Sequence, residues 1–194
     1  MSLALSPSLT KPSIPGDLAM WCFILAELAV FALLFLVWLI FRHQQPLLFS
    51  NGQDLLHPWL GVINTLALLS GSYAVAMAME LQQTQPRPKQ AAAWLLGAWL
   101  CGLAYCLLKG WEYQQLWQQG WQLDSNAFFS SYYLLTAFHL LHVILGMLIL
   151  AWMAWHLYAD HADSNHSQGL QSGASYWHMV DLVWLILFPL VYLL

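Results

Sequence analysis

The sequence predicts an all-α integral membrane protein, a bundle of five transmembrane helices. Of its 194 residues, 60% are hydrophobic and only 7% are charged, whereas soluble domains carry about 25% charged residues. Five apolar stretches are long enough to cross roughly 30 Å of hydrocarbon at about 1.5 Å per residue. The chain also holds 12 Trp, 8 Tyr and 9 Phe, and aromatic rings gather at membrane interfaces.

Each apolar stretch should be helical, because an unpaired backbone group in lipid costs several kcal/mol. The polar tail, residues 1–17, lacks the basic start and short apolar core of a signal peptide, so the first stretch is expected to remain as an anchor. Residues 18–194 then form a single transmembrane domain. The expected helices are 18–41, 58–79, 91–112, 132–158 and 176–194.

Polar segments with turn-forming residues connect these helices. Residues 42–57 and 82–90 contain prolines that stop one helix and space the next. Residues 114–131 are rich in Gln and are expected to lie along the interface through Trp117 and Trp121. We therefore expect four polar connections and no internal repeat.

The positions of lysine and arginine predict the orientation of the chain. Lys11, Arg87 and Lys89 fall on the side of the N-terminus, and Arg42 and Lys109 fall on the other side. This bias places the N-terminus in the cytoplasm and the C-terminus in the periplasm. The net charge of −4, without a basic patch, excludes nucleic acid as an expected partner and leaves membrane lipid.

Glu27 lies one-third to halfway along the first expected helix. An ionisable group at membrane depth is costly, so it calls for a partner or a role. Its neighbours Ile24, Leu28 and Phe31 cannot pair with it. Three interpretations stay open: a protonated acid bonded to another helix, an acid that exchanges protons or gates, and a contact with lipid or a cofactor.

Two later helices each carry a polar pair at i,i+3 on one face. His139 and His142, with Thr136 nearby, lie on the fourth helix, and His178 and Asp181 lie on the fifth. Interhelical hydrogen bonds, worth about 0.6–2 kcal/mol each, are one interpretation. A metal or haem site is a second, because His is the commonest metal ligand, and proton transfer is a third. The spacing alone does not choose among them.

Charged and small residues on the second and third helices have structural interpretations. Lys109 and Glu112 are at i,i+3 and can pair, and we expect them to anchor the helix end at the interface. Small residues at four-residue spacing predict close helix packing. These residues are Ser70, Ala74 and Ala78, then Ala67 and Gly71, and on the third helix Ala98 and Gly102.

Cysteines and loop histidines are given no chemical role. The cysteines lie in apolar runs without metal spacing or a disulfide framework, so we expect small core residues. They are Cys22, Cys101 and Cys106. The last loop can bind a divalent metal weakly, but its irregular, Ser-rich spacing favours a solvated loop. Its residues are His156, Asp160, His161, Asp163 and His166.

Five motifs, one for each expected helix and in chain order, resemble subunit III of the haem–copper oxidase superfamily. Residues 20–27 resemble the helix with a buried, carbodiimide-reactive glutamate, and residues 64–71 resemble an Asn-Thr…Leu-Leu-x-Ser stretch. Residues 110–113 resemble a Glu-Tyr ending. Residues 136–143 and 176–184 resemble the motifs Thr-Gly-Phe-His-Gly-x-His-Val and Trp-His-Phe-Val-Asp-x-Val-Trp.

The chain resembles the shorter, five-helix form of this family, which lacks the first two of seven helices. Within it, the opening segment, residues 15–21, is most similar to the branch formed by the accessory subunits of nitric oxide reductase. Quinol oxidase and bacterial cytochrome c oxidase subunits III are close competitors. Ala137 and Leu140 replace glycines of the family motif, which removes the basis for the family's close packing there.

The resemblance implies a non-catalytic accessory subunit of a respiratory haem–copper oxidase or nitric oxide reductase in the electron transport chain of a bacterial inner membrane. Such a subunit stabilises its catalytic partner and influences proton uptake, gas access or lipid binding. The resemblance implies no cofactor or metal in this chain. Haem and metal belong to the catalytic subunit, a cytochrome c subunit is a further candidate partner, and phospholipid is a candidate ligand.

The resemblance also assigns residues. Glu27 becomes the buried functional acid, and no catalytic residue is expected. The fourth and fifth helices share a buried polar network of Thr136, His139, His142, His178 and Asp181. The remaining motif residues are Asn64, Thr65, Ser70, Glu112, Tyr113, Trp177 and Trp184.

Two alternatives from other functional classes remain. One is a membrane enzyme that binds haem or metal through the histidines of the fourth and fifth helices. The other is a proton-linked transporter that uses Glu27 and Asp181.

Overall fold

The computed structural model describes residues 18–84, 87–159 and 166–194, and these residues contain six helices and no strand. Five of the helices are long and apolar enough to cross a membrane. The predicted all-α fold with five membrane-spanning helices is therefore confirmed. The helices are α1 (Leu18–Gln44), α2 (Pro46–Gln53), α3 (Pro58–Thr84), α4 (Pro88–Gln118), α5 (Ala127–Tyr158) and α6 (His166–Tyr192).

The helices extend further than the apolar stretches predict. α4 continues to Gln118, and α5 begins at Ala127, where the Asn126 side chain accepts a hydrogen bond from the Phe129 N–H at 3.0 Å. Most of the segment expected along the interface is therefore helix. Hydropathy marks only the part of a helix inside hydrocarbon, whereas caps and backbone hydrogen bonds set its ends. The short α2, which starts at Pro46, was not expected.

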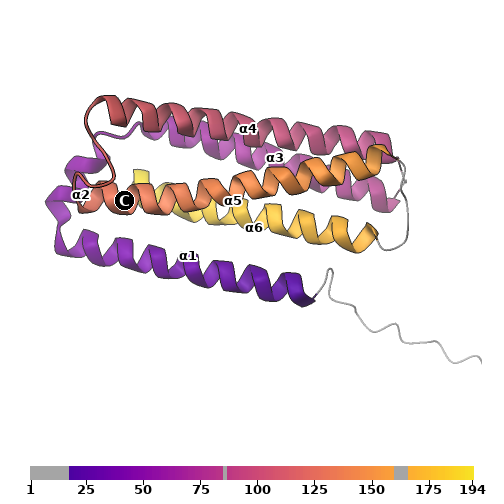
Figure 1. Cartoon of the computed structure of the whole chain (residues 1–194), viewed down its shortest axis with the longest axis horizontal. Coiled ribbons are helices and arrows are strands. Elements are labelled where there is room, and N and C mark those ends of the chain that lie inside the picture. The colour runs from indigo at the N-terminus through magenta and orange to yellow at the C-terminus, as the bar shows by residue number, and fades with distance from the viewer. Residues whose placement is uncertain (1–17, 85–86, 160–165) are drawn as a thin grey trace, which may run out of the picture.

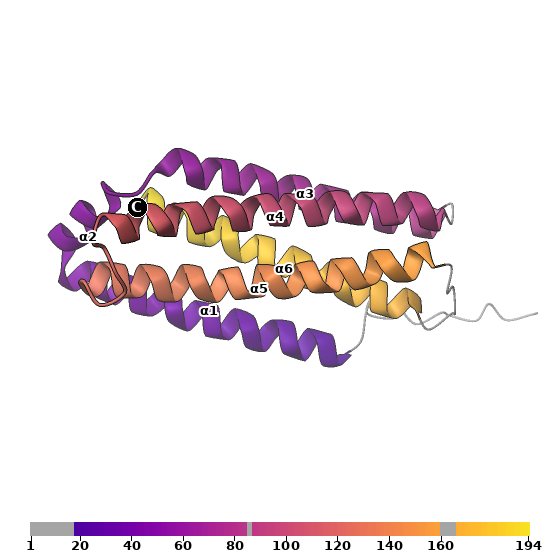
Figure 2. The same ribbon diagram turned by 45° about the horizontal axis from the view of Figure 1, so that its top comes forward.

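The spanning helices run alongside one another in three layers. α3 and α4 form one side of the bundle, α5 and α6 lie in the middle, and α1 covers the other side (Figure 1). Seen after a 45° turn, α1 again lies along α5 and away from α3 (Figure 2). α1 is also the least buried of the five spans. The four helices α3–α6 thus make the packed core, and α1 is attached to it through α5 and α6.

The indole of Trp177 in α6 lies against three glycines from three other helices. A Cβ atom added to Gly71 of α3 would lie 3.3 Å from the ring, one on Gly102 of α4 3.0 Å, and one on Gly146 of α5 2.9 Å. Trp177 is only 1% exposed. A methyl group would collide with the indole at Gly146 and would lie tightly against it at Gly102 and Gly71, so we call these three residues the glycine socket.

Most of the small residues expected to permit close packing are buried, and Gly71 lies at the α3–α4 contact, where an added Cβ would be 3.3 Å from the Cys101 Cβ and 3.4 Å from the Ala98 carbonyl oxygen. Gly71, Ala74 and Ala78 are buried on α3, and Ala98 and Gly102 are buried on α4. Two neighbours do not take part, because Ser70 is exposed and Ala67 is only half-buried.

The cysteines are not the core residues that the sequence predicted. Cys22 is exposed, and Cys101 and Cys106 are half-buried. Cys22 points outward because α1 buries one narrow side against the bundle and leaves the rest of its apolar surface open.

Replacing Gly146 with Ala is expected to lower the free energy of unfolding by about 1–3 kcal/mol, the usual range for overpacking. The new methyl group would have to displace the buried Trp177 ring. Gly97→Ala on α4 is the matched control, because no atom lies within 4 Å of its Cβ position. Denaturation of the purified protein in detergent measures both, and equal stability of the two variants would contradict the socket.

Candidate functional site

Lys109 and Glu112 of α4 form an ion pair inside the bundle. Lys109 Nζ lies 2.8 Å from Glu112 Oε2, and the two side chains are 0% and 3% exposed. The expected interfacial anchor is therefore wrong, whereas the expected pairing is confirmed. The anchor was wrong because α4 continues to Gln118, which places both residues within the span rather than at its end.

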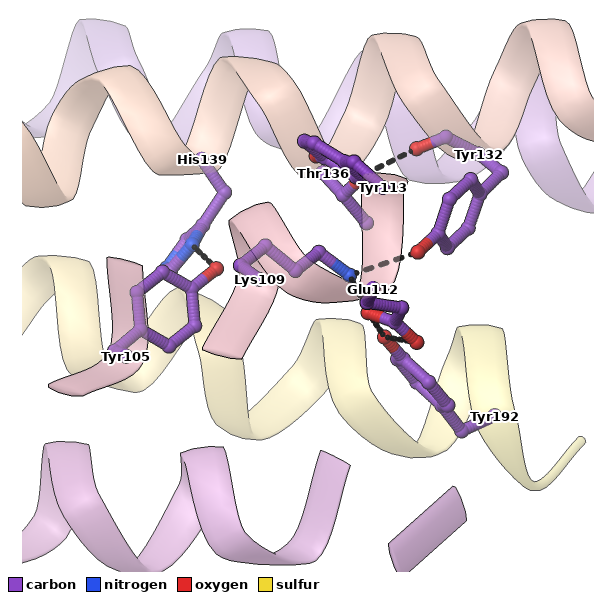
Figure 3. A network of polar contacts seen from close by, with 8 residues as sticks. All are labelled: Tyr105, Lys109, Glu112, Tyr113, Tyr132, Thr136, His139 and Tyr192. Atoms are coloured by element: carbon purple, nitrogen blue, oxygen red, sulfur yellow. Dashed lines mark hydrogen bonds and ion pairs between the residues drawn. The ribbon is translucent and has the colours of Figure 1, made fainter. Parts of the chain in front are cut away.

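The Lys109 ammonium uses all three of its hydrogen-bond donors. Besides Glu112, it donates to the hydroxyls of Tyr132 at 3.0 Å and Tyr192 at 2.7 Å (Figure 3). Tyr192 in turn donates to the Glu112 carboxylate at 2.7–2.9 Å. Nζ also lies 4.8 Å from the centre of the Tyr132 ring and 5.7 Å from that of Trp184, where cation–π attraction acts. A buried charge requires such complete pairing.

A second group of hydroxyls continues this network along α5. Tyr113 donates to Thr136 Oγ1 at 2.8 Å, and Thr136 donates to the backbone carbonyl of Tyr132 at 2.6 Å. Thr136 thus contacts the α4 residues rather than the histidines of its own helix. We refer to Lys109, Glu112, Tyr113, Tyr132, Thr136 and Tyr192 as the α4 network.

His139 is fully buried and bonded through both ring nitrogens. Its Nε2 lies 3.1 Å from the carbonyl oxygen of Val180 on α6, and its Nδ1 lies 3.0 Å from the hydroxyl of Tyr105 on α4 (Figure 3). A carbonyl can only accept, so Nε2 carries the proton. In the neutral ring Nδ1 then accepts from Tyr105. His139 thereby joins three helices.

His142 pairs with Glu27 across the contact between α5 and α1. His142 Nδ1 donates to the carbonyl of Phe138 at 2.8 Å, and its Nε2 lies 2.9 Å from Glu27 Oε2. Because Nδ1 already holds its own proton, a single further proton can serve the Nε2–Oε2 contact. The pair is then either a carboxylic acid with a neutral imidazole or a carboxylate with an imidazolium. The side chain of Glu27 is 21% exposed.

His178 and Asp181 lie apart from this pair, so the single network expected between α5 and α6 divides. His178 is exposed, and its Nδ1 lies 2.7 Å from Ser72 Oγ on α3. The division follows from the geometry of α6. Val180, whose carbonyl binds His139, lies on the side of the helix toward α5, whereas His178, which shares a face with Asp181 at i,i+3, is turned toward α3.

Two of the remaining motif residues, Thr65 and Trp184, meet at the α3–α6 contact. Trp184 Nε1 donates to Thr65 Oγ1 at 3.0 Å. Asn64 is fully buried, and neither polar atom of its side chain has a partner among the described residues. Ser70 faces outward.

His139, His142 and His178 do not present a common set of free nitrogens to a metal ion or haem iron. His139 and His142 use both ring nitrogens in hydrogen bonds. Within residues 18–84, 87–159 and 166–194, no group of three or more His, Cys, Asp or Glu could hold a metal ion. Of the loop group, Asp160, His161 and Asp163 lie outside the described residues, as does the side chain of His166.

Comparison with known proteins matches the sequence of this chain to a protein family. The family profile described as cytochrome c oxidase subunit III covers residues 16–194. This chain belongs to that family. It is a multi-pass membrane protein with five apolar helices of spanning length in its described part.

Three relatives illustrate the range of the family. The chain is 33% identical to cytochrome c oxidase subunit 3 of Synechocystis sp., over 98% of this chain and 86% of that protein. It is 34% identical to cytochrome c oxidase subunit 3 of Arabidopsis thaliana, over 73% of this chain and 52% of that protein. It is 30% identical to the heme-copper oxidase subunit I+III of Aeropyrum pernix, over 90% of this chain and 22% of that protein. The chain therefore spans about half of the plant subunit III.

Sequence reasoning missed two residues of the α4 network in this subunit III family member, Tyr132 and Tyr192, and the nearby Tyr105. Tyr105, Tyr132 and Tyr192 were not singled out, because tyrosines are common at membrane interfaces. The sequence did carry a signal that Lys109 and Glu112 form a buried pair. They are the only charged residues between Lys89 and Asp124, and they have opposite charges at i,i+3.

Replacing Lys109 with Met is expected to destabilise the protein by about 3–5 kcal/mol, because the buried Glu112 charge loses its partner. The double variant Lys109→Met/Glu112→Gln should be more stable than the single variant, since it removes both charges. Chemical denaturation of the purified variants measures the difference. A double variant that is less stable than Lys109→Met would show that the two charges are not coupled.

Proposed function

We propose that this chain is a non-catalytic accessory subunit of a respiratory haem–copper complex, and that it binds and stabilises the catalytic subunit in the membrane. The observation that carries this proposal is the family match over nearly the whole chain. The name of the Aeropyrum relative adds support, because it describes subunits I and III in one protein. A subunit found fused to another is expected to lie beside it when the two are separate chains.

The buried polar groups support a role other than catalysis. Lys109 and both ring nitrogens of His139 are occupied by hydrogen bonds within the described chain. We infer that the haem and metal of the complex are held by the catalytic subunit. An optical spectrum of the isolated chain tests this, and a haem absorption band would contradict it.

We further propose that the Glu27–His142 pair holds one exchangeable proton. The pair is partly open at the surface between α1 and the bundle, where Glu27 is 21% exposed. The hydrogen bond of His142 Nδ1 to the Phe138 carbonyl is separate from this contact. Such a group suits a subunit that influences proton uptake. Gas access and phospholipid binding are further roles expected at this surface.

The proposed complex is either an oxidase or a nitric oxide reductase. The opening segment, residues 15–21, and the short five-helix length favour the nitric oxide reductase branch. The relatives described above carry oxidase names. A cytochrome c subunit is a further candidate partner in either complex.

The tagged chain is expected to co-purify with a large haem-binding subunit from native membranes in mild detergent, and mass spectrometry of that subunit distinguishes oxidase from nitric oxide reductase.

In the purified complex, Glu27→Ala should leave assembly intact but shorten the active lifetime during turnover or slow proton uptake. Glu27→Gln, which keeps a hydrogen-bonding group without an exchangeable acid, separates the two effects. Unchanged lifetime, proton uptake and assembly in both variants would remove any role for Glu27.

We propose that the N-terminus lies in the cytoplasm and the C-terminus in the periplasm of a bacterial inner membrane. Because Lys109 lies inside the bundle, it no longer counts as a loop charge. Lys11, Arg87 and Lys89 then stand against Arg42 alone, which strengthens the positive-inside argument.

Alkaline phosphatase fused after Gln122, in the connection between α4 and α5, is expected to be active, because this enzyme works only in the periplasm. The matched fusion after Thr84, at the end of α3, should be inactive. The reverse pattern would invert the orientation of the whole bundle.

A further inference from the structure

The outer face shared by α3 and α6 carries polar side chains at the middle of the membrane span. His178 lies near the middle of α6 and is exposed, and Ser72, its hydrogen-bond partner, lies near the middle of α3. Toward the start of α6, the half-buried Gln171 and Ser175 continue the same side of the helix at i−7 and i−3 from His178. We call Ser72, Gln171, Ser175, His178 and Asp181 the α3–α6 polar face.

This face contains hydrogen-bonding atoms that the described chain does not satisfy. His178 uses Nδ1 toward Ser72, and its Nε2 makes no hydrogen bond to a described residue. Asp181 lies on the same side of α6 but is covered by the chain, with 5% of its surface exposed, so the exposed group of this face is the His178 ring. A buried polar atom without a hydrogen bond is costly, and the hydrocarbon of lipid tails cannot supply one. A protein side chain at the same depth can.

Other outward surfaces of the bundle differ at this depth. The exposed side of α5 carries large apolar residues, which are suited to lipid. They are Leu134, Leu141, Ile144, Leu145, Leu148, Trp152 and Trp155. On the α3–α6 polar face, by contrast, Ala76 is exposed beside Ser72. Its small side chain lets another helix approach closely.

We propose that the α3–α6 polar face is the docking surface for a transmembrane helix of the catalytic subunit. That helix would carry a hydrogen-bonding side chain at mid-membrane depth, opposite the exposed His178. The catalytic subunit is the occupant because the Aeropyrum relative carries subunits I and III in a single chain, which makes subunit I its neighbour. This inference rests on the proposed function and names the surface through which that function acts.

The test uses the complex in its native membrane. A photo-cross-linking amino acid replaces Leu182, which lies one turn from His178 and is 50% exposed. The matched control carries it in place of Leu148 on the outer side of α5, which is 63% exposed. Illumination should join Leu182 variants to the haem-binding subunit and should join Leu148 variants to lipid. Cross-links from position 182 to lipid only, or to a second copy of this chain, would overturn the proposal.

A second measurement does not depend on cross-linking. His178→Phe removes the outward hydrogen bond but keeps an aromatic ring, and it is expected to reduce the catalytic subunit retained in stringent detergent about 3- to 30-fold, the equivalent of one interhelical hydrogen bond. Leu148→Phe is the control and should retain as much as the wild type. If the wild type retains the catalytic subunit but His178→Phe retains it equally, the docking surface is wrong and the proposed function stands. If the wild type retains none, both fail.

Discussion

The close contact between the Trp177 indole and three glycines sets the spacing of the four core helices. Side chains have fixed lengths, so the polar contacts of the interior form only at particular helix separations. His139 reaches the Val180 carbonyl on α6, and Lys109 reaches Tyr192 on the same helix. Both contacts cross between helices that Trp177 holds together. The packing of Trp177 and the polar contacts of the interior therefore depend on the same helix separations.

The interior and the outer surface satisfy polar groups in different ways. Inside the bundle, hydrocarbon offers no partners, so the chain itself pairs the Lys109 ammonium, although it leaves the side-chain amide of the buried Asn64 without a described partner. The Glu27–His142 pair likewise draws both partners from the chain, and it joins α1 to the core through a polar contact. The α3–α6 polar face departs from this rule. The His178 ring is exposed on this face and uses only Nδ1 within the described chain, so its second nitrogen is available to a neighbouring helix.

The sequence predicted the features that depend on neighbouring residues and failed on those that depend on distant ones. Apolar length is a local property, so the five spans were correct. Helix ends depend on caps such as Asn126, so α5 and α6 began earlier than expected. Glu27 and His142 were each singled out, but their pairing joins residues 115 positions apart. The spacing of His178 and Asp181 showed that they share a face, and it could not show that this face turns away from α5 and toward α3.

The distribution of the α4 network over three helices has a consequence for biogenesis. Helices enter the membrane in the order of their synthesis, and a lysine at mid-span opposes insertion by about 2.5–3.5 kcal/mol. When α4 emerges, Lys109 has only Glu112 beside it, because Tyr132 belongs to α5 and Tyr192 to α6. The pairing of the Lys109 ammonium is therefore complete only after α6 has been translated.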